Sequence, residues 1–191
     1  GKECMLRHSA LETLYKVGKY STHEKNSLTF KEIKNLEITQ IACWPEKLKE
    51  LNNLLVKNLD INNTPTFNKG IVFENNSLWR MEPLKWWLFN SGIEISEDIA
   101  TTLDMSHAFT GIEIKGDSST LFLNRHLPID LRNKNFPDLS SASTAIHHVS
   151  VKLFKISLNN YCLYIPRGFA LSIWEIHLET ADQCGYEVLD R

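Results

Sequence analysis

The stretch that decides the fold is VSVKLFKISLNNYCLYIPRGFALSIWEI, residues 149–176. Apolar side chains stand at every second position of residues 149–153, which is the period of a β-strand with one buried face. Asn159 and Asn160 then form a tight-turn pair, because asparagine tolerates the left-handed backbone that hairpin turns need. Residues 161–165 are the returning strand, so the stretch opens with an antiparallel hairpin.

A helix follows this hairpin over residues 169–183. Pro166 closes the second strand, and Gly185 stands where a helix commonly has its C-terminal cap. One face of the helix is apolar, at the spacing of three and four residues that a half-buried helix requires. That face consists of Ala170, Ile173, Trp174, Leu178 and Ala181.

The residues before the hairpin predict two strands and a second helix. Residues 101–105 and 111–115 are strand-like, and the second of these runs alternates isoleucine with charged side chains. A Gly-Asp turn follows and ends at Asp117, which is a good helix N-cap. The helix that begins there ends at Pro128 and carries Leu121, Leu123 and Leu127.

The first half of the chain shows the same order of elements. Residues 36–43 alternate as in a strand, and Pro45 suits the first position of a helix. The leucines that follow mark one stripe of an amphipathic helix. Short apolar runs at 71–73, 78–81 and 86–89, separated by turn signals, are interpreted as antiparallel strands. The leucine stripe consists of Leu48, Leu51, Leu55 and Leu59.

The order strand–helix–strands therefore occurs twice, over about residues 36–90 and 101–186. This pattern predicts an α+β fold built from two ferredoxin-like halves. We expect residues 36–191 to form a single domain, because a chain of 191 residues has the length of one domain. Residues 1–35 are polar and weakly periodic. We expect them to form an N-terminal arm that cannot bury itself well and becomes ordered against a partner.

The composition is that of an ordinary globular protein, with 42% hydrophobic and 23% charged residues. The formal net charge is −2, and lysine and glutamate are interleaved, which argues against nucleic acid as a partner. No apolar run reaches the roughly 18 residues of a membrane span, and the first residues lack the apolar segment of a secretory signal. We therefore expect a cytoplasmic protein that has no membrane partner.

The sequence carries few groups that could do chemistry. It has no dinucleotide fingerprint, phosphate-binding loop, nucleophile elbow or zinc-protease motif. Its four cysteines are not spaced as metal ligands, and we expect buried, unpaired thiols. His107 follows Asp104 and Ser106, but neighbours on an extended segment point to opposite faces, so these residues are expected to cap a strand end. We expect no catalytic, cofactor-binding or metal-binding residue in this chain.

Two further features indicate an interface. Trp86 and Trp87 are neighbours on a predicted strand, so their rings face opposite sides and one of them is expected to leave the core. That ring either anchors a protein interface or lies in a groove that the N-terminal arm fills. Arg167, between the last strand and the last helix, could hold a carboxylate or phosphate, fix a neighbouring carbonyl, or pair with a partner subunit. The candidate interface or structural residues are Trp86, Trp87, His107 and Arg167.

A series of short motifs runs through nearly the whole chain. The second half contains DMSH (104–107), IEIKG (112–116), LPIDL (127–131), FP (136–137), Thr144, YCLYIPRGFA (161–170), SIW (172–174) and GY (185–186). The first half contains SALE (9–12), QIACWP (40–45), LWRMEP (78–83) and WWL (86–88). In order and spacing, these motifs resemble the gamma subunit of heterotetrameric sarcosine oxidase. Gly168 departs from that family, which more often has serine at this position.

The resemblance implies membership of an enzyme complex that oxidatively demethylates sarcosine to glycine, passes the one-carbon unit to tetrahydrofolate and yields hydrogen peroxide. It implies that this chain is a non-catalytic structural subunit, with alpha, beta and delta subunits as its partners. The FAD, FMN, NAD, tetrahydrofolate and zinc of such a complex are then held by other subunits and not by this chain. The resemblance also implies a fold similar to the folate-binding domain of aminomethyltransferases.

A stand-alone folate-binding one-carbon protein of the aminomethyltransferase type is the alternative. Such an enzyme needs an acidic residue that grips the pterin and a further C-terminal domain, and we expect 191 residues to leave no room for that domain. A folate-sensing or assembly protein unrelated to sarcosine is a third hypothesis.

Overall fold

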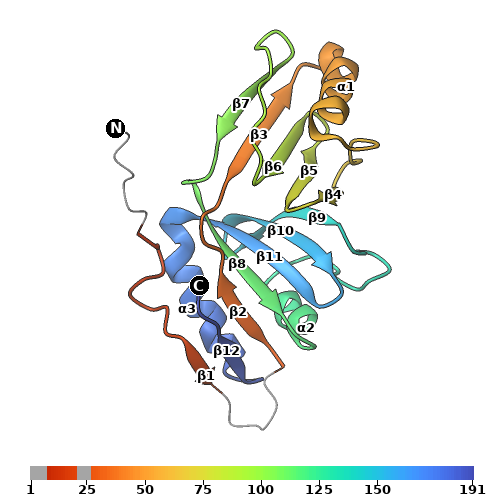
Figure 1. The fold of residues 1–191 in the computed structure, drawn as a ribbon. Coiled ribbons are helices and arrows are strands. Elements are labelled where there is room, and N and C mark those ends of the chain that lie inside the picture. Colours follow the sequence, from red (N-terminus) through yellow and green to blue (C-terminus); the bar gives the residue numbers. More distant parts are fainter. Residues whose placement is uncertain (1–7, 21–26) are drawn as a thin grey trace.

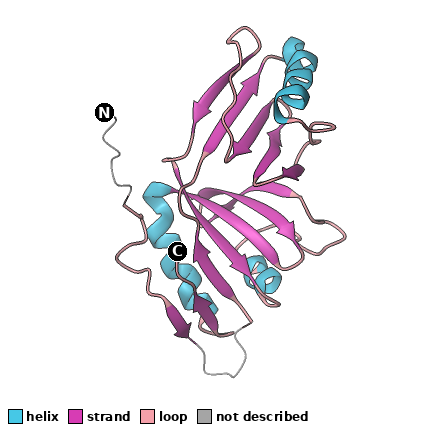
Figure 2. Ribbon diagram, viewed as in Figure 1, coloured by secondary structure: helices cyan, strands magenta, loops and turns pink. Residues whose placement is uncertain are grey.

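The computed structural model describes residues 8–20 and 27–191, which fold into two β-sheets with three α-helices (Figures 1 and 2). One sheet has five strands in the spatial order β4 (Gly70–Phe73), β5 (Asn76–Glu82), β6 (Lys85–Phe89), β3 (Ile38–Cys43) and β7 (Ala100–Asp104). The other has seven, in the order β1 (Gly18–Tyr20), β12 (Tyr186–Val188), β2 (Thr29–Glu32), β8 (Phe109–Lys115), β11 (Asn160–Pro166), β10 (Val149–Ser157) and β9 (Ser141–Ile146). The fold is therefore α+β, as predicted.

The predicted leucine stripe forms the buried face of helix α1 (Leu48–Leu59). Pro45 begins the short 3₁₀ turn η1 (Pro45–Lys47) that leads into α1, since its fixed φ suits a helix start. Asp60, with φ 52°, closes the helix in the left-handed conformation. The buried leucines Leu51, Leu55 and Leu59 cover one face of the five-stranded sheet.

The two halves share one topology. In the first half, β3 is followed by α1 and by the antiparallel strands β4, β5 and β6, and β6 returns to pair with β3. In the second half, β8 is followed by α2 (Ser119–Asn124) and by β9, β10 and β11, and β11 returns to pair with β8. The spatial orders β4-β5-β6-β3 and β9-β10-β11-β8 are therefore equivalent.

The sheet of each half also contains one strand that is adjacent, in sequence, to the other half. Strand β2 directly precedes β3 along the chain, yet it pairs with β8 in the seven-stranded sheet. Strand β7 directly precedes β8, yet it pairs with β3 in the five-stranded sheet. The two crossing segments, residues 33–37 and 105–108, link the sheets at the middle of the molecule (Figure 1). The predicted halves are thus interlocked by an exchange of strands.

An aromatic cluster fills the space between the two sheets. The Trp79 ring centroid lies 4.8 Å from that of Phe154, and the Trp87 centroid lies 4.9 Å from that of Phe109. Gly70 lies under Trp79 so closely that a Cβ atom there would come within 2.3 Å of the indole ring. Glycine is therefore required at the point where β4 passes this ring.

The prediction that Trp86 or Trp87 leaves the core is wrong, because the two side chains are 0% and 2% exposed. Their rings do belong to opposite faces, as the strand alternation predicted. Trp86 lies in the cluster that α1 covers, and Trp87 lies in the cluster between the sheets. Strand β6 is buried because its sheet is covered on both faces, so neither ring reaches solvent.

The prediction that residues 1–35 cannot bury themselves well is wrong for their described part. Leu11, Leu28 and Phe30 are all 0% exposed, and β2 is an internal strand of the seven-stranded sheet. Residues 1–7 and 21–26 of the expected arm lie outside the described residues. The short strand β2 has only two inward side chains, Phe30 and Glu32, which is too weak a periodicity to reveal a core strand.

The end of the chain forms helix α3 (Ala170–Ala181) after the 3₁₀ turn η2 (Arg167–Phe169). Trp174 and Phe122 place α3 and α2 in the same core cluster beside the seven-stranded sheet. The predicted cap at Asp117 is wrong: the N-cap of α2 is Ser118, whose side chain makes no capping hydrogen bond. Strands β1, β9 and β12 were not predicted.

Candidate functional site

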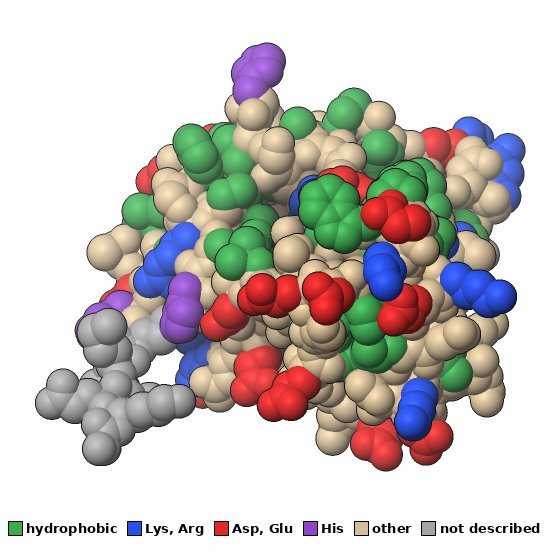
Figure 3. Space-filling model, turned by 90° about the horizontal axis from the view of Figure 1, so that it is seen from above, with side chains coloured by type: hydrophobic (Ala, Val, Ile, Leu, Met, Phe, Trp, Pro, Cys, Tyr) green, Lys and Arg blue, Asp and Glu red, His purple; other side chains and the backbone are tan. Residues whose placement is uncertain are grey.

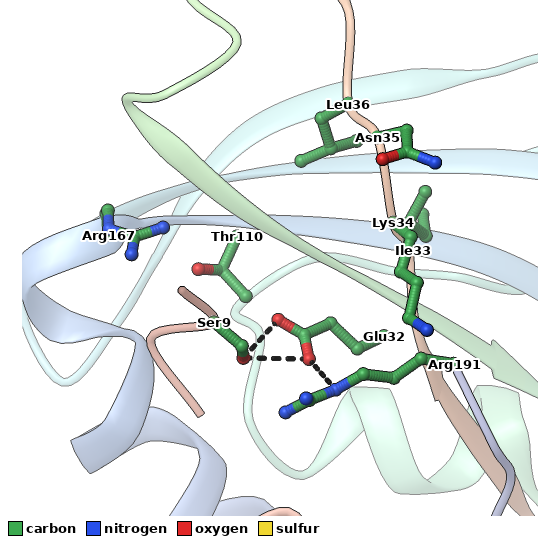
Figure 4. Close-up of a pocket in the computed structure, with 9 residues that line it drawn as sticks. All are labelled: Ser9, Glu32, Ile33, Lys34, Asn35, Leu36, Thr110, Arg167 and Arg191. Carbon is green, nitrogen blue, oxygen red and sulfur yellow. Dashed lines mark hydrogen bonds and ion pairs between the residues drawn. The ribbon is translucent and has the colours of Figure 1, made fainter. Parts of the chain in front are cut away.

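A cavity of about 160 Å³ lies beside β2, and Arg167 and Arg191 line it from different parts of the chain (Figure 4). Three of its lining side chains are cationic, Lys34, Arg167 and Arg191, and one, Glu32, is a carboxylate. The excess of cations favours an anionic group in this cavity.

Glu32 is held by partners on both sides. Its side chain extends from β2 and the residue is only 7% exposed. The Ser9 hydroxyl donates to both carboxylate oxygens, at 2.6 and 2.9 Å, and Arg191 Nε pairs with Oε2 at 2.6 Å. Glu32 therefore joins three segments that are far apart in the sequence.

Tyr15 contacts both members of the Glu32–Arg191 ion pair. Its hydroxyl accepts a hydrogen bond from the Glu32 amide at 2.9 Å and donates one to the Leu189 carbonyl at 2.7 Å. The Arg191 guanidinium carbon lies 4.5 Å from the Tyr15 ring centroid, within cation–π range. Burial raises the pKa of the Tyr15 hydroxyl, so this group remains a neutral donor.

Arg167 fixes a carbonyl, which is one of the roles that the sequence left open. Its Nη2 atom donates to the backbone carbonyl of His8, and its amide donates to the Ala108 carbonyl at 2.9 Å. The arginine therefore ties the segment before Ser9 to the crossing that carries His107.

His107 is exposed on that crossing, and its neighbours behave as predicted. The Ser106 hydroxyl accepts a hydrogen bond from the Ile38 amide at 2.9 Å, and Asp104 Oδ1 accepts one from the Ser106 amide at 2.9 Å. Asp104 and Ser106 therefore bond the backbone where β7 ends, which confirms their predicted capping role. The Arg167 amide bonds the carbonyl of Ala108, the residue that follows His107. No contact between the side chains of His107 and Arg167 is found among the described residues.

A second cleft, of about 270 Å³, opens between the two sheets. Lys85 at this cleft pairs with Glu82 at 3.0 Å. Burial lowers the pKa of Lys152, which donates to the Ser143 hydroxyl at 2.8 Å. The apolar side chains of the cleft are Met81, Trp87, Met105, Phe109 and Pro166. The wall of this cleft is therefore apolar in part and also carries the charged side chains of Glu82, Lys85 and Lys152.

Several of these residues could not be found from the sequence. Glu32 and Arg191 are separated by 159 positions, and no spacing rule connects them. Lys155 is 1% exposed and donates to Asn133 and to the Phe136 carbonyl, both at 2.9 Å. The available signal was its position, because Lys155 continues the alternation of Val151 and Leu153 along β10 and a charged residue therefore stands at an inward position.

Three of the cysteines, Cys43, Cys162 and Cys184, are described and are free thiols, as predicted. Only Cys162 among them is buried, and burial raises the pKa of its thiol to about 12; Cys4 lies outside the described residues. Within residues 8–20 and 27–191, no three histidine, cysteine or acidic side chains cluster as metal ligands. In the same part of the chain, no helix has both the length and the apolar character of a membrane span.

Comparison with known proteins supports the fold. No family model matches the sequence, and no curated protein matches it either. Among solved structures, a chain of the heterotetrameric sarcosine oxidase from Corynebacterium sp. U-96 has a TM-score of 0.73 and 13% identity, over 93% of this chain and 96% of its own. The chain shares this fold. The glycine cleavage system aminomethyltransferase T from Bartonella henselae has a TM-score of 0.59 and 8% identity over 86% of this chain, which spans 48% of that protein.

Proposed function

We propose that this chain is a non-catalytic structural subunit of a complex of the sarcosine oxidase type. The complex would oxidatively demethylate sarcosine to glycine, transfer the one-carbon unit to tetrahydrofolate and produce hydrogen peroxide. The observation that carries the proposal is the extent of the likeness. It covers 96% of a chain of heterotetrameric sarcosine oxidase, but less than half of an aminomethyltransferase. A similar chain therefore exists as one component of a multi-subunit enzyme.

The contacts around the cavity support a structural role. Glu32 is bound by Ser9 and Arg191, and Arg167 is bound to the His8 carbonyl, so these groups already have partners within the chain. A charged group that performs catalysis must meet a substrate, whereas these groups join separate segments of the same domain. They are positioned to keep one surface of the subunit in a fixed shape.

The remaining parts of the proposal concern the rest of the complex. Alpha, beta and delta subunits would be the partners, and FAD, FMN, NAD, tetrahydrofolate and zinc would be bound by them. The assembly would act in the cytoplasm. The cation excess in the cavity beside β2 is the feature of this chain that would suit a carboxylate from a neighbouring subunit.

The alternative function is a stand-alone folate-binding one-carbon protein. The observation in its favour is that the aminomethyltransferase fold covers 86% of this chain. The two functions differ in what the isolated chain does. A folate-binding protein binds tetrahydrofolate by itself, whereas a structural subunit acts only in the assembly.

The test is purification through an affinity tag on this chain, from cells that naturally produce it. We expect yellow flavoproteins to co-purify and the assembly to produce hydrogen peroxide when sarcosine is added. The isolated chain, titrated with tetrahydrofolate while its tryptophan fluorescence is followed, should give no saturable change. Saturable binding by the isolated chain, without co-purifying flavoproteins, would favour the alternative.

A further inference from the structure

The cavity beside β2 carries more positive charge than its own contacts use. Of the three cationic side chains that line it, only Arg191 is paired with a carboxylate, that of Glu32. Neither Arg167 nor Lys34 forms an ion pair with any residue that the structure describes. Both positive charges are therefore uncompensated within the described chain.

Arg167 is oriented but not neutralised. Its Nη2 atom donates to the His8 carbonyl, and this side chain makes no other hydrogen bond among the described residues. The carbonyl carries no net charge, so the contact fixes the guanidinium without compensating its positive charge. A guanidinium has several N–H donors in one plane, and neighbouring donors match the paired oxygens of a carboxylate. The remaining donors of Arg167 therefore suit a carboxylate at the cavity.

Thr110 adds a hydroxyl to the same cavity. This residue of β8 is only 3% exposed, and its hydroxyl forms no hydrogen bond within the part of the chain that the structure describes. Figure 4 shows the hydroxyl turned toward the side of the cavity on which Arg167 lies. Polar groups that are buried in folded proteins generally have a hydrogen-bond partner. Because so little of Thr110 is exposed, an external acceptor for its hydroxyl has to lie inside the cavity.

The size of the cavity and the position of Glu32 restrict the ligand. A volume of about 160 Å³ is below the roughly 300 Å³ at which pockets for drug-sized ligands begin, so the cavity suits a small acid or a single acidic side chain. Glu32 in the same wall repels any anion, and it repels a phosphate dianion more than a singly charged carboxylate. Its own charge is offset by Arg191 at 2.6 Å. A carboxylate is therefore the anion that fits this wall best.

The excess of positive charge is local to this cavity. The chain as a whole has a formal net charge of −2. Figure 3 looks down on the end of the molecule that carries α1, and it shows acidic side chains gathered beside apolar ones. An anion is not attracted to the molecule as a whole, so its binding would depend on the groups of the cavity.

We propose that the cavity beside β2 is a binding site for a carboxylate, carried either by a small organic acid or by an acidic side chain of another subunit. Arg167 would bind both carboxylate oxygens, Thr110 would donate to one of them, and Lys34 would add electrostatic attraction. Glu32 would stay paired with Arg191, as in the free chain. The subunit source rests on the proposed function, whereas the small-acid source does not.

Nuclear magnetic resonance of the isotope-labelled chain, titrated with succinate, tests the site. Succinamide, which has neutral amides in place of the carboxylates, is the matched control ligand. We expect succinate, but not succinamide, to shift the backbone amide signals of Thr110 and Arg167 in a saturable way. The absence of a saturable shift at these residues with succinate would overturn the proposal.

Substitutions locate the bound carboxylate. Arg167→Ala should weaken succinate binding at least about tenfold, and Thr110→Val, which keeps the shape of the side chain but not its hydroxyl, at least about threefold. The control is Arg125→Ala, which removes an exposed arginine that bonds Gln183 outside this cavity. It should change binding less than about twofold. Equal effects of Arg167→Ala and Arg125→Ala, in chains equally stable to heat, would show that succinate responds only to general positive charge and would overturn the proposal.

The complex purified through the tagged chain distinguishes the two sources of the carboxylate. If the source is a small acid, succinate binds in the complex as in the free chain, and Arg167→Ala changes assembly less than about twofold. If the source is an acidic side chain of another subunit, the complex no longer binds succinate, and Arg167→Ala weakens assembly at least about tenfold. Loss of succinate binding in the complex, without an effect of Arg167→Ala on assembly, would overturn the proposal.

Failure of this inference can be told apart from failure of the proposed function. Succinate binding by the free chain that Arg167→Ala abolishes keeps the carboxylate site, even if no flavoprotein co-purifies and no peroxide is formed. A complex that produces peroxide from sarcosine, but whose isolated chain does not bind succinate, removes the carboxylate site and keeps the proposed function.

Discussion

The two halves of this chain share one topology but have different surroundings. The β9-β10-β11-β8 half is continued by β2, β12 and β1, and helices α2 and α3 cover one face of its sheet. The β4-β5-β6-β3 half is continued only by β7, beyond which no described strand follows. One repeated unit is thus enclosed by further strands and helices, while the other ends at β7. The difference teaches that topology alone does not decide how much of each half is covered.

The largest expected effect comes from separating the halves. Residues 1–98 and 99–191 expressed as two fragments should each fail to fold, because β2 belongs to one fragment but completes the sheet of the other, and the same holds for β7. Far-ultraviolet circular dichroism should show no cooperative thermal transition for either fragment. Mixing the fragments should restore one. A fragment that melts cooperatively alone would show that the strand exchange is dispensable.

Tryptophan substitutions should sharpen the contrast between buried and exposed rings. Trp87→Ala should lower the free energy of unfolding by about 3–5 kcal/mol, the usual cost of emptying a buried aromatic site. Trp44→Ala should change it by less than about 0.5 kcal/mol, because its ring is 61% exposed. Urea unfolding of the two variants measures both values. Similar losses in the two variants would refute the assignment of Trp87 to the space between the sheets.

Acid should destabilise the second half through His177. This side chain is 0% exposed in α3, its ring centroid lies 4.7 Å from that of His126, and burial lowers its pKa to about 3 from 6.5. His177 therefore binds a proton below pH 6.5 in the unfolded chain, but only near pH 3 in the folded chain. The free energy of unfolding consequently decreases as the pH falls from 6.5 to about 3. The slope should approach 1.4 kcal/mol per pH unit, on the order of one proton.

The control for this pH dependence is His177→Leu. Neither ring nitrogen of His177 has a hydrogen-bond partner among the described residues, so leucine removes the titration without breaking a bond. Urea unfolding between pH 6.5 and pH 4 should then show a smaller slope than in the unaltered chain. An unchanged slope would assign the acid sensitivity to other groups.

The smallest effects concern the cavity beside β2. Arg191→Ala should lower the free energy of unfolding by about 1–2 kcal/mol, because it leaves the buried Glu32 carboxylate with Ser9 as its remaining partner. Arg167→Ala should cost less than about 1 kcal/mol, since one partly exposed hydrogen bond to a carbonyl is lost. Thermal unfolding compares the variants. A larger loss for Arg167→Ala would reverse the proposed ranking.

Local patterns were sufficient for most elements of the fold. The leucine stripe of α1 and the Asn159–Asn160 turn between β10 and β11 are set by neighbours in sequence, and the structure confirms both. Strand alternation also placed Trp86 and Trp87 on opposite faces. It could not show that both faces are covered, because the covering elements come from distant parts of the chain.

The exchange of strands β2 and β7 between the halves, and the residues that meet in the cavity beside β2, could not be predicted from local sequence patterns. Strand β2 is short and polar on one side, and its place beside β8 depends on tertiary packing rather than on its own periodicity. Glu32, Ser9 and Arg191 meet only after that strand is in place. Arg167 was recognised because it stands at a strand–helix junction, but its partner, the His8 carbonyl, carries no sequence signal.

Native mass spectrometry of the complex, purified through a tag on this chain, tests the central claim most directly. The account predicts an assembly in which this 22.0 kDa chain is bound to larger flavin-carrying subunits and which produces hydrogen peroxide from sarcosine. Partial dissociation should release this chain without flavin. A 22.0 kDa species alone, or an oligomer of this chain only, would contradict the claim that it is a structural subunit of such an enzyme.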